Sequence, residues 1–181
     1  MIWGGGCGIL SAKLKNINFY EDEFMGDYLI AVASTADVTL EFLQEHNIPF
    51  ISYSYTLENN VYEDNCREDA RQEAYTQMRQ GKIYTTSMIN TNTYYEFLSG
   101  LINQAKDVIY LDMSKEMSSY YISLQQAGEQ IREEHPDRKL YIMDTLCISG
   151  GLGLLLEHMV FAATRMARAL TSLSSGARRT S

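Results

Sequence analysis

The sequence predicts a three-layer α/β/α domain in which helices cover both faces of a mainly parallel sheet. The chain has 181 residues, a length that suits one such domain with a single good core. Hydrophobic residues make up 45% and charged residues 21% of the chain, as in ordinary soluble, folded domains. Short apolar runs of strand length alternate with stretches of helical periodicity, which is the pattern of βαβ units.

Five segments have the composition of β-strands. They are short runs of apolar, β-branched or aromatic residues, which favour strands buried in a sheet. The second segment contains Pro49, which a strand tolerates near its start. The stretch Glu58-Asn59-Asn60 that follows it is typical of a turn. The predicted strands are residues 28–33, 48–55, 82–84, 108–111 and 140–143.

Five further segments have apolar residues at helical spacing. The second of them is amphipathic and stops at Gly81, a residue that commonly ends helices. The third opens with Thr93-Tyr94-Tyr95-Glu96, a capping-box pattern that predicts a helix start at Thr93. The predicted helices are residues 40–46, 67–80, 93–105, 118–134 and 150–163.

The two ends of the chain lie outside this alternation. We expect residues 1–27 to form an N-terminal extension, residues 28–163 the α/β domain, and residues 164–181 a flexible, basic tail rich in Ser and Arg. The start of the chain lacks the basic region of a signal peptide. The apolar run at residues 152–163 is shorter than the roughly 20 residues that span a bilayer. We therefore expect a cytoplasmic protein without integral membrane association.

The charge of the chain argues against nucleic-acid binding. Acidic residues number 23 and basic residues 15, for a formal net charge of −8. All the acidic residues lie in the first 159 positions, where the net charge is therefore more negative still. Affinity for DNA or RNA comes mainly from Lys and Arg side chains that neutralise phosphates, so an acidic domain is a poor candidate.

Hydroxyl side chains gather where the predicted strands give way to helices. In a doubly wound sheet, ligands bind beyond the carboxyl ends of the strands, and helix N-termini there favour anions. Each hydroxyl taken alone is explained better as a helix cap, so the concentration of them is the informative feature. The junctions are Ser34-Thr35-Ala36-Asp37, Thr85-Thr86-Ser87, Ser114 with Ser118-Ser119, and Asp144-Thr145 with Ser149.

These junctions lack the groups of a catalytic site. The residues His46, His135 and His158 all lie away from them, so a nucleophile at Ser118 or Cys147 has no base predicted beside it. Neither residue lies in a G-x-S-x-G or similar motif, which makes a Ser- or Cys-dependent hydrolase the least supported alternative. A neutral, hydroxyl-rich site can hold a carboxylate by hydrogen bonds but is poorly equipped to abstract protons.

No metal site, cofactor or disulfide is indicated either. The glycines of Gly150-Gly151-Leu152-Gly153 do not have the G-x-G-x-x-G spacing of a dinucleotide loop. The carboxylates of Asp37 and Asp144 have no grouped partners, so capping or turn formation explains them. The three cysteines are odd in number and lack ligand spacing; they are Cys7, Cys66 and Cys147.

Four junctions taken together have a recognisable order. They are Ser34-Thr35-Ala36-Asp37, then Thr86-Ser87, then Ser114 through Ser118-Ser119-Tyr120-Tyr121, then Asp144-Thr145 with Ser149 and Gly151. This order resembles the DegV family of bacterial fatty-acid-binding proteins. That family's segments run approximately D-S-T-A-D, T-S-Q-P-S, S-S-x-L-S-G-T-Y-Q-S-A, and D-S followed by S-x-G-x-G. The resemblance spans about residues 29–160, and the joint order is much more specific than any one motif.

The resemblance implies the N-terminal α/β domain of a two-domain fold that holds a long-chain fatty acid between its domains. It implies that Thr86 and Ser118 bind the acyl carboxylate, with no catalysis and no cofactor. In many bacteria such proteins hand the fatty acid to a separate fatty-acid kinase, so the resemblance also implies a possible kinase partner. The supporting loop residues would be Ser34, Thr35, Ser87, Ser114, Ser119 and Asp144.

The sequence also departs from the family pattern. Ala33 replaces the first Asp, Met88-Ile89-Asn90 replaces Q-P-S, and Ser119-Tyr120 replaces G-T. The chain ends where the family's second domain would begin, so a homo-oligomer, a partner chain or residues 1–27 would have to supply the missing wall of an acyl pocket. These departures keep open a second hypothesis, an interaction module or vestigial protein that keeps the fold without the ligand.

Overall fold

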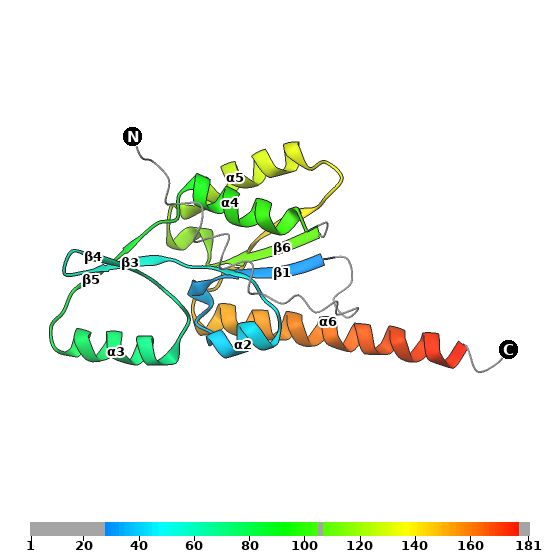
Figure 1. The fold of residues 1–181 in the computed structure, drawn as a ribbon, viewed down its shortest axis with the longest axis horizontal. Coiled ribbons are helices and arrows are strands. Elements are labelled where there is room, and N and C mark those ends of the chain that lie inside the picture. Colours follow the sequence, from blue (N-terminus) through cyan, green and yellow to red (C-terminus); the bar gives the residue numbers. More distant parts are fainter. Residues whose placement is uncertain (1–27, 105–106, 178–181) are drawn as a thin grey trace, which may run out of the picture.

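The fold is built on a four-stranded parallel sheet (Figure 1). The computed structural model describes residues 28–104 and 107–177, and side chains as far as Arg165, so the predicted extension at residues 1–27 lies outside the described residues. The strand order is β2-β1-β6-β7, and every neighbouring pair is parallel, which confirms the predicted sheet. The strands are β1 (Tyr28–Ala33), β2 (Phe50–Ile51), β6 (Asp107–Asp112) and β7 (Leu140–Asp144).

Helices cover both faces of this sheet, as the sequence predicts (Figure 1). One face carries α4 (Thr91–Ile102) and α5 (Tyr120–Glu134), and the other carries α2 (Leu40–Glu45) and α6 (Gly150–Ala177). Strand β1 shows why, because its side chains alternate between the two faces and almost all of them are buried. A strand buried on both faces reads as a continuous apolar run, which is how the sequence locates it.

The face beneath α2 and α6 is closely packed near the start of α6. Ile30 and Val32 of β1 pack there with Leu43 of α2 and with the buried leucines of α6. At Gly153, an added Cβ would lie 2.7 Å from the carbonyl oxygen of Ala36, so only glycine allows this approach of α6 to the short 3-10 helix η1 (Ser34–Ala36).

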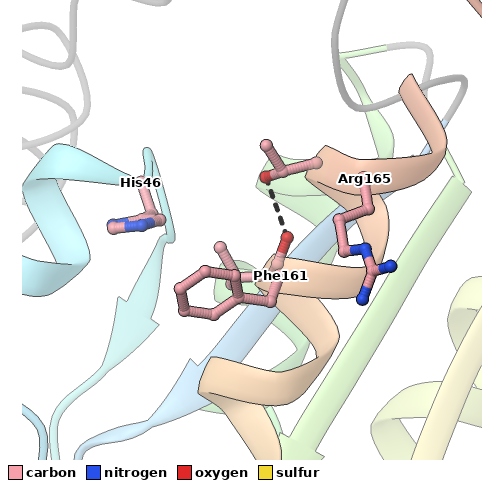
Figure 2. A pocket seen from close by; sticks show the side chains of 5 residues that line it. His46, Phe161 and Arg165 are labelled. Atoms are coloured by element: carbon pink, nitrogen blue, oxygen red, sulfur yellow. Dashed lines mark hydrogen bonds between the residues drawn. The ribbon is translucent and has the colours of Figure 1, made fainter. Parts of the chain in front are cut away.

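Farther along α6 the packing opens into a pocket of about 330 Å³ between the end of α2 and α6 (Figure 2). His46 and Phe161 lie on its two sides. The ring of His46 stacks on Phe42 and its Nδ1 lies 3.1 Å from the Phe42 carbonyl oxygen. Val160, Phe161, Thr164 and Arg165 of α6 line the pocket, beginning roughly 15 Å along the helix from its first residue. The pocket is therefore distant from the carboxyl ends of the strands.

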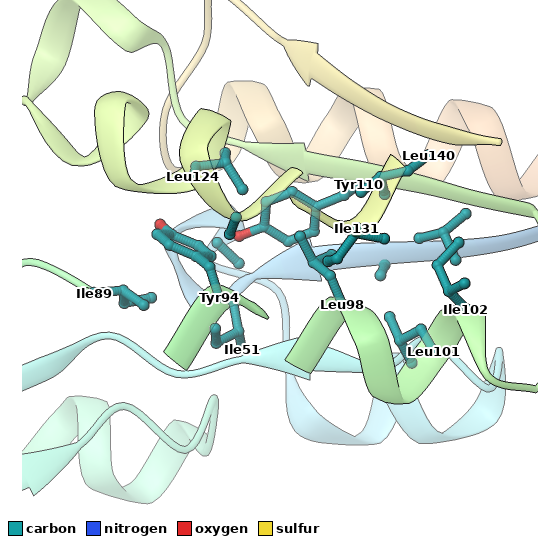
Figure 3. Close-up of a cluster of buried hydrophobic side chains, with 14 of the residues drawn as sticks. Ile51, Ile89, Tyr94, Leu98, Leu101, Ile102, Tyr110, Leu124, Ile131 and Leu140 are labelled. Atoms are coloured by element: carbon teal, nitrogen blue, oxygen red, sulfur yellow. The ribbon is translucent and has the colours of Figure 1, made fainter. Parts of the chain in front are cut away.

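The opposite face holds the larger hydrophobic cluster (Figure 3). Leu98 and Leu101 of α4 and Leu124 of α5 are fully buried there, among side chains of β1 and β6. Fully burying one such side chain contributes about 1.5–3 kcal/mol. Tyr94 and Tyr110 lie in the same cluster with their hydroxyls directed toward one end of it, where the candidate site begins.

A second, antiparallel sheet projects beyond the parallel one (Figure 1). Its order is β4-β3-β5, with β3 (Ser54–Leu57), β4 (Asn60–Glu63) and β5 (Tyr84–Ser87). The predicted single strand at residues 48–55 is therefore wrong, because β2 ends at Ile51 and β3 belongs to the other sheet. The predicted strand at residues 82–84 overlaps β5 only at Tyr84 and lies in the antiparallel sheet instead of the parallel one, and β4 was not predicted.

The turn between β3 and β4 lies where the sequence predicts one, at Glu58-Asn59-Asn60. Glu58 and Asn59 both have positive φ, 48° and 70°, which is the conformation that joins two strands in a tight hairpin. Non-glycine residues rarely adopt this conformation, so the sequence indicates a turn here without indicating a hairpin. The exposed residues of β4 add no apolar run that would reveal a strand.

The helix boundaries differ from the predicted ones by two residues at the starts of α4 and α5, by three at the end of α4, and by more at the end of α6. Helix α4 begins at Thr91, because the Asn90 side chain accepts a hydrogen bond from the Thr93 amide at 2.9 Å and caps the helix; the predicted start at Thr93 is wrong. Helix α5 begins at Tyr120 instead of residue 118. Helix α3 (Glu68–Arg79) is confirmed to within a residue, and it ends before Gly81, whose φ is 88°.

Helix α6 continues to Ala177, well past its predicted end at residue 163. Its last part is rich in Ala, Arg, Met and Leu, which are good helix formers. None of the helices within residues 28–104 and 107–177 is both long and apolar enough to cross a membrane. The division into a domain at residues 28–163 and a tail at residues 164–181 stays a prediction.

Candidate functional site

The loops that follow β1, β6 and β7 meet at the carboxyl edge of the parallel sheet. The Ser149 amide donates to the Thr35 carbonyl oxygen at 2.9 Å, and the Ser114 amide donates to the Cys147 carbonyl oxygen at 2.7 Å. The Lys115 ammonium lies 3.3 Å from the Asp144 carboxylate. Three of the four hydroxyl-bearing junctions predicted from the sequence are thus brought together by direct contacts.

Most hydroxyls of these loops have partners within the protein. Ser34 is buried, and its Oγ accepts a hydrogen bond from the Tyr53 amide at 3.1 Å. The Ser149 hydroxyl donates to Asp37 at 2.7 Å, and Ser114 Oγ accepts from the Glu116 amide at 3.3 Å. These side chains shape the loops and cap short turns, which is the role that the sequence predicts for each hydroxyl taken alone.

Asp144 has a similar role at the end of β7. Its Oδ1 accepts hydrogen bonds from the Lys115 amide at 3.3 Å and the Leu146 amide at 3.4 Å. Partial desolvation raises the pKa of Asp144, but these amides and the Lys115 ammonium outweigh it and hold the pKa below its ordinary value. Asp144 is therefore ionised near neutral pH and ties the loop after β7 to the loop after β6.

Asp112, the last residue of β6, is a buried carboxylate that the sequence analysis missed. Its side chain is 0% exposed and accepts hydroxyl hydrogen bonds from Tyr110 at 2.7 Å, Tyr94 at 3.0 Å and Thr35 at 3.4 Å. The Met113 amide donates to it at 2.8 Å. An acidic residue directly after the predicted strand at residues 108–111 was the available signal, but of its tyrosine partners only Tyr110 lies nearby in the sequence, so no local motif revealed the cluster.

Burial dominates the electrostatics of this cluster. Desolvation raises the pKa of Asp112 above its ordinary value, although hydrogen bonds from Tyr110, Met113, Tyr94 and Thr35 act in the opposite direction. Burial and the nearby Asp112 charge raise the pKa values of Tyr94, Tyr110 and Tyr53. These tyrosines therefore stay protonated and act as hydrogen-bond donors.

Two hydroxyls predicted to bind a ligand are placed differently from the rest. Thr86 lies on β5 and is exposed, and Ser118 has extended backbone just before α5 and is half-buried. Neither hydroxyl has a hydrogen-bond partner within the described part of the chain. The Ser119 hydroxyl lies 3.2 Å from the Met88 sulfur, so the segment after β5 reaches the start of α5. Thr86 and Ser118 are each within two residues of this contact.

The start of α5 adds backbone donors beside these hydroxyls. Ser119 occupies the N-cap position, but its side chain makes no capping hydrogen bond. The first amides of a helix have no partner inside the helix and attract anions, especially when no side chain caps them. This arrangement can accept a carboxylate through neutral donors. Ser87, the other predicted supporting residue on β5, is also exposed.

The described residues do not assemble a catalytic group around Ser118 or Cys147. His46 Nδ1 and His158 Nδ1 lie within hydrogen-bond distance of backbone carbonyls of their own helices, and His135 is at the end of α5. No group of three or more His, Cys, Asp or Glu side chains within residues 28–104 and 107–177 could hold a metal ion. Burial raises the pKa of the Cys66 thiol to about 12, so this thiol is unreactive.

The sequence matches a known protein family. A family model described as "Uncharacterised protein, DegV family" matches residues 28–174. This chain belongs to the DegV family. DegV domain-containing proteins of Clostridium perfringens and Lactococcus lactis are 28% and 27% identical to it over 135 residues, which are 74% of this chain and 46% of each relative. The chain thus spans about half the length of the curated DegV relatives it matches.

Solved structures of DegV proteins share the fold. A stearic-acid-binding protein from Eubacterium ventriosum superposes with a TM-score of 0.66 at 22% identity, covering 74% of this chain and 46% of that one. The fatty acid kinase B3 protein of Streptococcus pneumoniae, loaded with linoleic acid, superposes with a TM-score of 0.58 at 20% identity, covering 76% and 48%. At these identities the likeness shows the common α/β architecture.

Proposed function

We propose that this DegV chain binds a long-chain fatty acid, whose carboxylate is held by Thr86, Ser118 and the N-terminus of α5. The observation that carries the proposal is the pair of hydroxyls that have no hydrogen-bond partner among the described residues, near a helix start that no side chain caps. Two solved DegV structures with this fold are described as a stearic-acid-binding protein and as loaded with linoleic acid, which supports the ligand class.

Neutral donors suit a ligand that must be held and later released. A hydrogen bond to a charged group contributes about 1.5–3 kcal/mol, so two hydroxyls and one or two amides hold a carboxylate without a permanent ion pair. The ammonium of Lys115 is already paired with Asp144 and does not enter this set. Among the described residues, none of the histidines is positioned at this site to abstract a proton, which supports a binding role without catalysis.

Exposed apolar side chains continue from the carboxylate site. Met88, Met117 and Ile122 are 58%, 57% and 64% exposed, and each is within four residues of Thr86 or Ser118. Burying the acyl chain against such a surface contributes about 0.8 kcal/mol per CH₂ group. We propose that these side chains form one wall of the acyl site and that a second copy of the chain or another protein surface covers the other.

The same geometry fits transfer to a fatty-acid kinase. The carboxylate would lie at an exposed edge of the sheet, next to half-buried Ser118, where a second protein can reach it. One solved relative is itself described as a fatty acid kinase B3 protein. We propose that this chain presents the carboxylate to such a kinase.

Native mass spectrometry of the purified chain, followed by organic extraction, tests the proposal. We expect about one fatty acid per chain in the wild type and a loss of bound lipid in Thr86→Ala and Ser118→Ala. Thr85→Ala and Ser123→Ala are matched controls, because Thr85 is the neighbouring exposed residue of β5 and Ser123 lies one turn into α5. Both controls should retain the lipid.

The opposite result would favour the interaction-module hypothesis. If neither the purified protein nor the delipidated protein supplied with fatty acids carries any lipid, the chain keeps the DegV fold without the ligand. Equal lipid retention in Thr86→Ala, Ser118→Ala and the two controls would move the site elsewhere on the molecule.

A further inference from the structure

Asp112 is a buried charge without a basic partner. The described Lys, Arg and His side chains form no ion pair with it, and its own side chain is 0% exposed. An unpaired buried carboxylate destabilises a protein unless hydrogen bonds replace the water that it has lost. The hydrogen bonds that Asp112 receives therefore explain how it is tolerated, and the elements that donate them indicate its role.

Hydrogen-bond donors occupy the acceptor sites of both carboxylate oxygens of Asp112. Oδ2 accepts the hydroxyls of Tyr110 and Tyr94, and Oδ1 accepts the Met113 amide and the Thr35 hydroxyl. The Tyr53 hydroxyl lies 3.4 Å from Oδ1 and 3.0 Å from the Tyr94 hydroxyl. An ionised carboxylate offers about four lone-pair sites and no proton, so this arrangement fits the ionised form. A neutral group at residue 112 would present a proton to one of these donors.

One set of these contacts reaches the loop that carries Ser118. The Met113 amide donates to Asp112, and the Met113 carbonyl oxygen accepts a hydrogen bond from the Tyr120 hydroxyl. Met113 is therefore held on both sides, by Asp112 at its amide and by the first residue of α5 at its carbonyl. Ser118 lies between Met113 and Tyr120, so the position of its loop depends on the Asp112 contact.

A second set reaches the strand that carries Thr86. The Tyr53 hydroxyl contacts Asp112, and Tyr53 lies directly before β3. Two residues later, Tyr55 pairs with Thr86 across the antiparallel sheet. Tyr94, in the first turn of α4, holds the other end of the segment that follows β5. The same carboxylate is thus linked to both elements that border the proposed site, through Met113 on one side and through Tyr53 and Tyr94 on the other.

We propose that Asp112 is a positioning residue that holds the Ser118 loop and the Thr86 strand at the spacing a fatty-acid carboxylate requires. This inference rests on the proposed function for its role in binding, but its effect on the two elements is independent of any ligand. Asp112 does not touch the ligand. It acts through Met113 and Tyr53.

The variant Asp112→Asn tests the inference because asparagine has the same shape and lacks the charge. Backbone hydrogen exchange of the ligand-free protein should become faster in residues 113–121 and 84–94, while exchange in α6 stays as in the wild type. Affinity for the fluorescent long-chain fatty acid cis-parinaric acid should fall about tenfold or more, as expected for the loss of correct alignment of charge-assisted hydrogen bonds. The unfolding free energy should change little, because removal of a buried charge offsets the loss of charge-assisted hydrogen bonds.

Two further variants separate positioning from general stability. Tyr53→Phe should speed exchange in β3 and β5 and leave the Ser118 loop unchanged, and it should add little to Asp112→Asn in the double variant. Tyr121→Phe is the control, because this half-buried tyrosine of α5 makes no contact with Asp112 and its variant should match the wild type.

The experiments distinguish failure of the positioning role from failure of the proposed function. Wild-type exchange in both segments of Asp112→Asn would overturn the positioning role, whether or not the protein binds fatty acid. Faster exchange in a protein whose wild type takes up no cis-parinaric acid would support the positioning role and contradict the proposed function. An affinity loss matched by an equal loss of unfolding free energy would show a purely structural role and would overturn the inference.

Discussion

The parallel-sheet body and the antiparallel hairpin unit, which comprises β3, β4, α3 and β5 at residues 54–87, are held together by different forces. In the body, both faces of the sheet are covered, and the two hydrophobic clusters contain nearly all of the fully buried side chains. In the hairpin unit, α3 has no buried residue and all of β4 is exposed. Its aromatic contacts lie near the surface, where the rings of Tyr55 and Tyr62 stack and the ring of Tyr84 packs on Tyr55 at a tilt.

This difference matters because the proposed ligand contacts two regions of unequal stability. Thr86 lies on the hairpin unit, and Ser118 lies on the body. Local opening is easiest where few apolar side chains are buried, so the hairpin unit should open more often than the body. A ligand that contacts both residues would then be held by a fixed contact at Ser118 and an adjustable contact at Thr86.

The largest expected effect comes from truncating a side chain of the body. Leu101→Ala should lower the unfolding free energy by about 2–5 kcal/mol, because Leu101 is 0% exposed and its removal leaves a cavity. Met78→Ala, at a residue of α3 that is 44% exposed, should change it by less than about 0.5 kcal/mol. Urea unfolding followed by far-UV circular dichroism measures both. Similar effects from the two variants would contradict the comparison.

A smaller effect is expected where α6 meets η1. The variant Gly153→Ala should destabilise the protein by about 1–3 kcal/mol, because its Cβ would lie 2.7 Å from a backbone oxygen that cannot move freely. The control is Gly150→Ala in the same helix, where nothing lies within 4 Å of the added Cβ. Thermal unfolding of both variants checks the prediction, and a Gly153→Ala protein as stable as the control would show that α6 shifts easily.

The Asp112 cluster gives a pH dependence of known sign. The folded-state pKa of Asp112 is raised above the unfolded value of about 3.9, so the folded protein binds this proton more tightly. Its contribution to the unfolding free energy therefore falls as pH rises through the window between these pKa values, by about 1.4 kcal/mol per unit of pKa difference.

The difference in unfolding free energy between wild type and Asp112→Asn isolates this effect, because the other carboxylates cancel. Urea unfolding of both proteins from pH 4 to pH 8 should show the wild type losing stability relative to the variant as pH rises. If the wild type instead gains stability relative to the variant as pH rises, the hydrogen bonds to Asp112 lower its pKa by more than burial raises it.

The smallest effect should come from the ion pair between the hairpin unit and the body. Arg71 of α3 lies 3.2 Å from Asp37 beside η1, and both side chains are partly exposed. Arg71→Ala should lower the unfolding free energy by only about 0.2–1 kcal/mol. Hydrogen exchange should nevertheless speed up in α3 and remain unchanged in α4. Arg79→Ala, at the far end of α3, serves as the control, and equal exchange in both variants would show that the pair does not anchor the unit.

Local sequence pattern was sufficient to predict the body. Strands such as β1 and β6 are continuous apolar runs because they are buried on both faces, and their helices carry clear apolar stripes. The turn at Glu58 and Asn59 was predicted, but the strands of the hairpin unit were mispredicted because they are short and half-exposed or fully exposed. Partial burial weakens the alternation on which strand prediction depends.

The sequence located candidate site residues where a short local motif carries them. Thr86 and Ser118 lie in hydroxyl-rich junctions near strand ends, and the resemblance to the DegV family implied that they hold the carboxylate, a role that stays a proposal. Asp112 was missed because its partners Thr35 and Tyr94 come from other elements, 77 and 18 residues away along the chain. Only the folded sheet brings such groups together.

The pairing of β1 with β6 has a consequence for the order of assembly during synthesis. Tyr28 pairs with Asp107, which is 79 residues later in the chain, whereas β3 and β4 are joined by a two-residue turn. Local contacts form rapidly, and distant ones must await loop closure, so the hairpin is expected to form first although it is the less buried unit. Until β6 leaves the ribosome, the apolar residues of β1 lack a partner strand on that side. The newly made chain therefore passes through a stage in which its most hydrophobic strand is open to aggregation or to chaperones.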